Sequence, residues 1–151
     1  MLLLVLLCGC APKGAFPEAE RAECVYFFRT SGCEDAPEQR VLRDPEAIRA
    51  LGSALEACLG GELEPGAGAA DGGGVLCLLF VRDGQVLLRL GCASGAGAAP
   101  VLRVARPPRG QTGAVEFLYD AEGWSGSAYW APGAPQLLHA AFDNAEACPK
   151  P

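Results

Sequence analysis

The residues of this chain that could act together as a nucleophile and its base are Ser125, His139 and Asp143. Ser125 lies in GWSGS (123–127), which begins like the G-x-S-x-G nucleophile elbow but carries Ser127 in place of the last glycine. The elbow belongs on a strand-to-helix turn, and the sequence predicts no helix directly after Ser125. His139 lies one helical turn before Asp143, a spacing that is typical of an exposed i,i+4 pair. We therefore expect no enzyme, with a small serine hydrolase that uses Ser125 as an alternative.

Paired carboxylates and metal ligands give no second candidate for catalysis. The acidic pairs lie in predicted loops or on exposed helical turns: Glu34-Asp35, Glu62/Glu64 and Asp143/Glu146. Glycosidase chemistry needs two carboxyl groups at a defined separation across a cleft, which these positions do not predict. The chain has no C-x-x-C pair, and its single histidine is remote in sequence from every cysteine. We therefore predict neither a metal site nor a cofactor.

The N-terminal stretch MLLLVLLCGC (1–10) is apolar and ends in two closely spaced cysteines. A membrane-spanning helix needs roughly 20 apolar residues, so this run is too short to span and is typical of a secretory signal. The run Leu7-Cys8-Gly9-Cys10 resembles the lipobox of bacterial lipoproteins, which has Leu at −3, Gly at −1 and Cys at +1.

The lipobox resemblance implies that residues 1–9 are a cleaved signal peptide and that Cys10 carries the lipid (palmitate and related acyl groups). Ala11 at +2 is not the Asp that retains family members at the inner membrane. In a Gram-negative source the resemblance therefore implies outer-membrane attachment. The folded domain would then lie in the periplasm or outside the cell.

Cysteine number and compartment together predict disulfides. Without Cys8 and Cys10, six cysteines remain: Cys24, Cys33, Cys58, Cys77, Cys92 and Cys148. An exported domain lies in an oxidising compartment, so up to three disulfides are expected. Six cysteines allow 15 connectivities, and the sequence does not choose among them.

Charge restricts the partners. The net charge is −6, with only 12 Lys and Arg residues. Phosphate contacts dominate affinity for nucleic acids, so we expect no nucleic-acid partner. The same acidity makes the chain poorly suited to an anionic membrane surface, so the lipid is expected to provide the membrane attachment.

The segments that must position these residues follow the pattern of a small α+β domain. Residues 10–22 contain the lipidated Cys10, prolines, a glycine and alternating charges, and we predict a flexible tether there. Strands are predicted at 24–30, 75–82, 85–92, 101–106, 114–120 and 124–130, and residues 39–43 could add a partner strand.

Two helices are predicted. Asp44 is a good N-cap for the first, which has one apolar face and ends before Gly60-Gly61. The second is started by Pro135 and stopped by Pro149. We therefore expect one domain over residues 23–148, with both helices packed on an antiparallel sheet of five or six strands.

The hairpin at 75–92 decides whether Cys77 and Cys92 can form a disulfide. With Asp83-Gly84 as a type I′ turn, the two cysteines are diagonal neighbours on one face. With Gly84-Gln85 as the turn, they lie directly opposite each other. The sequence leaves both registers open.

An aromatic segment provides the candidate binding surface, formed by Trp124, Ser125, Tyr129 and Trp130. Trp and Tyr are enriched at binding hot spots, so we predict a protein partner or an envelope component here. The alternative is that both Trp side chains lie in the core under the last helix.

The run SGSAY (125–129) also resembles the S-G-x-x-Y motif of the membrane-bound lipoprotein inhibitors of animal-type lysozyme. In those proteins a loop Ser and Tyr enter the cleft of the enzyme. The resemblance makes a lysozyme-type hydrolase inhibitor a further alternative. Those inhibitors are all-β barrels, however, whereas this chain has two helix signals.

Overall fold

The fold is a single antiparallel sheet with helices on one face. The structure, a computed structural model, describes residues 14–30, 37–64, 74–94, 99–107, 113–114 and 125–148. Eight strands form the sheet in the order β3-β8-β6-β5-β4-β1-β2-β9, and the short β7 also pairs with β5. Their bounds are β1 Cys24–Arg29, β2 Glu38–Leu42, β3 Glu62–Leu63, β4 Val75–Arg82, β5 Gln85–Ala93, β6 Val101–Arg106, β7 Gly113–Ala114, β8 Ser125–Trp130 and β9 Glu146–Ala147.

The predicted α+β class is confirmed, but the expected five or six strands are too few. The additional strands include β3 and β9, which have two residues each and lie at the two edges of the sheet. Runs this short have no alternating pattern that a sequence reading can detect. Of the strand predicted at 114–120, Ala114 lies in β7 and the remainder lies outside the described residues.

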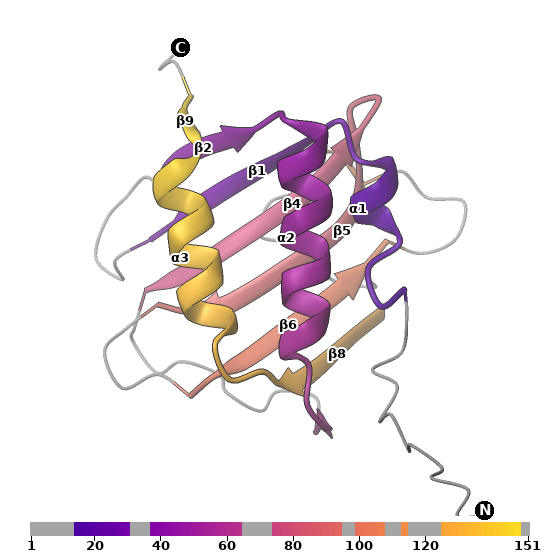
Figure 1. The fold of residues 1–151 in the computed structure, drawn as a ribbon, viewed down its shortest axis with the longest axis vertical. Helices are drawn as coiled ribbons and strands as arrows, with labels where there is room; N and C mark the ends of the chain where they lie inside the picture. The colour runs from indigo at the N-terminus through magenta and orange to yellow at the C-terminus, as the bar shows by residue number, and fades with distance from the viewer. Residues whose placement is uncertain are drawn as a thin grey trace, which may run out of the picture.

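Both predicted helices are confirmed. They are α2 (Pro45–Cys58) and α3 (Ala134–Asn144), and they lie side by side across one face of the sheet (Figure 1). The Asp44 side chain caps α2 by accepting a hydrogen bond from the Glu46 N–H at 3.1 Å. Helix α3 ends at Asn144, before the predicted stop, because the chain then pairs with β2 as β9.

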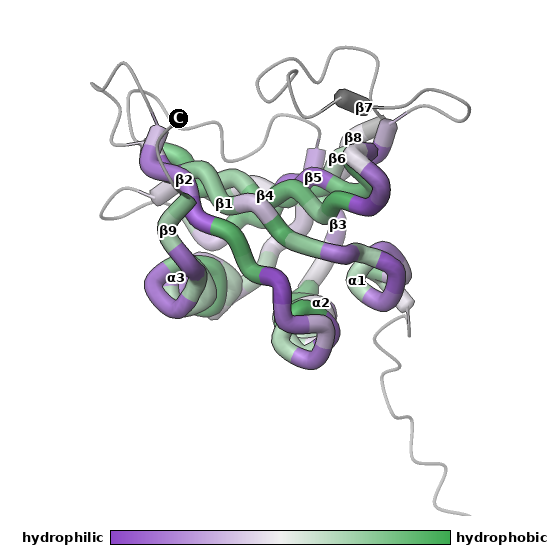
Figure 2. The backbone as a smooth tube through the Cα atoms, turned by 90° about the horizontal axis from the view of Figure 1, so that it is seen from above, coloured by the Kyte–Doolittle hydropathy of each residue, from purple (hydrophilic) through white to green (hydrophobic). Residues whose placement is uncertain are grey.

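The main core lies between the sheet and the helices. Apolar side chains of β1, β4, β5 and β6 that point toward α2 and α3 are buried, among them Phe27, Phe80, Leu88, Leu90 and Leu102. Figure 2 shows the described helices together on one side of the sheet. We call the opposite side the helix-free face; its buried apolar cluster consists of Cys24, Phe28, Val41, Leu79, Val81 and Val86.

The prediction of a flexible tether over 10–22 is wrong for residues 14–22. A short helix, α1 (Glu18–Arg21), packs on α2, and Phe16 and Ala19 are buried in the main core. The close approach of α1 and α2 depends on Gly52, where an added Cβ would lie 2.5 Å from Cβ of Ala19. The folded unit therefore includes residues 14–22, which precede the predicted start at residue 23.

A β-bulge sets the register of the β4–β5 hairpin. Asp83 and Gly84 have positive φ and form the predicted turn, but the register shifts by one residue between Phe80 and Val81. As a result Cys77 pairs with Gly91, while Cys92 pairs with Leu76. Neighbouring positions on a strand face opposite sides of the sheet, so Cys77 and Cys92 lie on opposite faces. Both registers considered from the sequence are therefore wrong.

The described cysteines are free thiols, which corrects the expectation of a disulfide-stabilised domain for this part of the chain. They are Cys24, Cys58, Cys77, Cys92 and Cys148. Cys33 and Cys10 lie outside the described residues. Among the described cysteines, Cys92 lies on the helix-covered face and Cys24 and Cys77 lie on the other, so the sheet separates Cys92 from these two.

Candidate binding surface

The predicted binding residues are divided between the two faces of β8. Because side chains alternate along a strand, Tyr129 and Trp130 point in opposite directions. Tyr129 pairs with Leu102 and packs, half-buried, against the main core, whereas the Trp130 residue is 45% exposed. Ser125 begins β8, and Trp124 lies outside the described residues. The alternative that both tryptophans are core residues is therefore wrong for Trp130.

Trp130 lies on the helix-free face. One row across four strands consists of Cys77, Gly91, Arg103 and Ala128, as the successive pairings show. Two residues further toward the same end of the strands are Val75, which pairs with Ala93, and Trp130, which pairs with Val101. Val75 and Trp130 are the exposed large hydrophobic residues of the described chain.

The backbone of Trp130 is held on its outer side by the turn after α2. The Gly60 N–H donates to the Trp130 carbonyl at 2.6 Å, and the Trp130 N–H donates to the Gly61 carbonyl at 2.9 Å. A Cβ at Gly60 would lie 2.7 Å from that carbonyl oxygen, so the close approach requires glycine. Trp130 is thus an exposed aromatic side chain on a fixed backbone, which lowers the entropy lost when it binds a partner.

The residues of the lysozyme-inhibitor resemblance lie in a strand. Residues Ser125 to Tyr129 all belong to β8 and pair in register with β6. The resemblance implies a loop at this place, and the described helices α2 and α3 depart from an all-β barrel. The structure therefore gives the inhibitor alternative no additional support.

Asp143, one of the residues of the hydrolase alternative, has a different partner. Asp143 Oδ1 lies 3.9 Å from Nη1 of Arg29 on β1, and this ion pair replaces the expected contact with His139. Asn144, the next residue on α3, donates its side-chain amide to the Ala140 carbonyl at 3.0 Å. Among the hydrogen bonds and ion pairs of the described residues, none joins His139 to β8.

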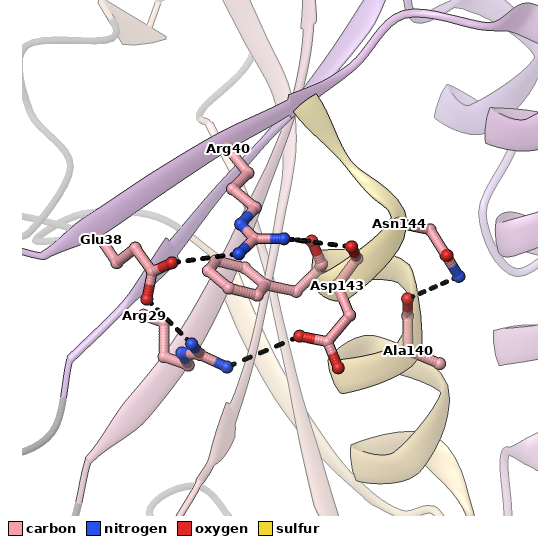
Figure 3. A network of polar contacts seen from close by, with 7 residues as sticks. Arg29, Glu38, Arg40, Ala140, Asp143 and Asn144 are labelled. Atoms are coloured by element: carbon pink, nitrogen blue, oxygen red, sulfur yellow. Dashed lines mark hydrogen bonds and ion pairs between the residues drawn. The ribbon is translucent and has the colours of Figure 1, made fainter. Parts of the chain in front are cut away.

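A cluster that the sequence did not predict surrounds Phe142 at the C-terminal end of α3 (Figure 3). The guanidinium carbons of Arg29 and Arg40 lie 4.1 and 4.5 Å from the centroid of the buried Phe142 ring. Arg40 also donates to the carbonyls of Phe142 and Asp143, at 3.1 and 3.0 Å. Because these carbonyls end the helix, the cation satisfies them and complements the negative end of the helix dipole.

Glu38 links the two arginines of this cluster. Its carboxylate accepts from Arg29 at 2.8 Å and from Arg40 at 3.2 Å. These hydrogen bonds, chiefly the one from Arg29, hold the pKa of Glu38 below its usual value. Each of the three residues is one of several similar charges in the sequence, so only the tertiary contact with α3 distinguishes them.

Burial raises the pKa of three of the described thiols, those of Cys24, Cys77 and Cys92. The pKa of Cys92 rises to about 11. Arg89 Nε lies 3.2 Å from the Cys77 sulfur and opposes the rise there. Since the thiolate is the nucleophile, these thiols are held in their unreactive form.

The described part of the chain contains neither a metal-binding cluster nor a membrane-spanning helix. No group of three or more His, Cys, Asp and Glu residues is arranged there to hold a metal ion. None of the described helices is long and apolar enough to cross a membrane. Comparison with protein-family models, with curated proteins and with solved structures finds no match.

Proposed function

We propose that this chain is a lipid-anchored bacterial envelope protein without enzymatic activity, which binds another protein or an envelope component through the surface around Trp130. The lipobox-like run that ends at Cys10 supports the anchor. The observation that supports the binding surface is the exposed indole of Trp130 on a fixed backbone.

The anchor is tested by acylation of Cys10. Cells expressing the full chain are labelled with radioactive palmitate, and the same is done with Cys10→Ala. We expect the label in the native chain alone, with the modified protein in the outer membrane of a Gram-negative host. Equal labelling of the two proteins would refute the anchor.

The binding surface is tested by crosslinking in the envelope. We expect Trp130→Ala to lose the crosslinked partner, because truncating an aromatic hot-spot residue removes about 2 kcal/mol or more of binding free energy. Val75→Ala removes the other exposed large hydrophobic side chain of the helix-free face and is the matched control. Circular dichroism verifies that both variants fold. A crosslinking pattern that is the same in all three proteins would contradict the proposal.

A further inference from the structure

We draw no further inference here: the strongest candidate, the surface patch of Trp130 and Val75 at one end of the helix-free face, carries none, because nothing in the described part of the structure shows what covers it.

Discussion

Arg106 holds the buried carboxylate of Glu18 with two hydrogen bonds, one from Nε to Oε1 at 2.5 Å and one from Nη2 to Oε2 at 3.3 Å. The side chain of Glu18 is 6% exposed and that of Arg106 is 39% exposed, so the acid is removed from water while its partner remains at the surface. The pair joins α1 to the end of β6, and it fixes the first residues of the folded unit on the sheet.

We expect Arg106→Ala to destabilise the protein by roughly 1–3 kcal/mol, because a buried carboxylate loses its partner. Urea unfolding measures the change. Adding Glu18→Gln to Arg106→Ala removes the stranded charge, so the double variant should be more stable than Arg106→Ala alone. Arg49→Ala, which removes a 3.9 Å contact between exposed side chains, should cost less than about 1 kcal/mol. Equal losses in Arg106→Ala and Arg49→Ala would contradict the buried pair.

We expect Gly52→Ala to destabilise the protein by about 1–3 kcal/mol, because its Cβ would lie 2.5 Å from that of Ala19. Adding Ala19→Gly removes the clash and should restore part of the loss. The matched control is Gly61→Ala, where an added Cβ meets nothing within 4 Å. Thermal unfolding of the native protein, Gly52→Ala, Ala19→Gly, the double variant and Gly61→Ala gives the result. Additive effects of the two core changes would show that α1 and α2 do not meet there.

Glu38 makes stability depend on pH. The hydrogen bond from Arg29 lowers the pKa of Glu38 from its usual value of 4.5. The contribution of Glu38 to the stability of the fold is therefore fully present above pH 4.5 and is lost as the pH falls through the pKa of the folded state. We expect Glu38→Gln and Arg29→Ala each to flatten the decline of the melting temperature below about pH 5. A decline in these variants as steep as in the native protein would show that folding does not lower the pKa of Glu38.

Cys92 should resist alkylation in the folded, reduced protein. Burial raises its pKa to about 11, so at pH 8 only about one thiol in a thousand is ionised. Brief treatment with iodoacetamide, followed by peptide mass spectrometry, should modify the half-buried Cys58 first. In urea the two cysteines should react alike. Comparable rates in the native protein would place Cys92 outside the core.

The register of β4 and β5 also predicts which disulfide does not form. Cys77 and Cys92 lie on opposite faces of the sheet, because Cys77 pairs with Gly91 and Cys92 with Leu76. We expect no Cys77–Cys92 peptide after oxidation of the folded protein and digestion without reductant. Recovery of that peptide would show that the bulge between Phe80 and Val81 is absent.

The sequence by itself determined the elements whose signals are local. Asp44 and Pro45 mark the start of α2, Asp83-Gly84 marks the β4–β5 turn, and Pro135 lies in the first turn of α3. Caps and tight turns depend on φ, ψ and hydrogen bonds within about four residues, so residue types in a short window specify them. The α+β class followed from these elements.

Only the tertiary structure decided the features that depend on residues far apart in the chain. The bulge that places Cys77 and Cys92 on opposite faces has no signature in the residue types of the hairpin. The packing of residues 14–22 on the domain depends on Gly52 and Arg106, which are distant in the sequence. The exposure of Trp130 depends on β8 lying near an edge of the sheet, where, of the described residues, the two-residue β3 and the Gly60-Gly61 turn lie beside it. Burial is a property of the surroundings of a side chain, and a sequence window does not contain those surroundings.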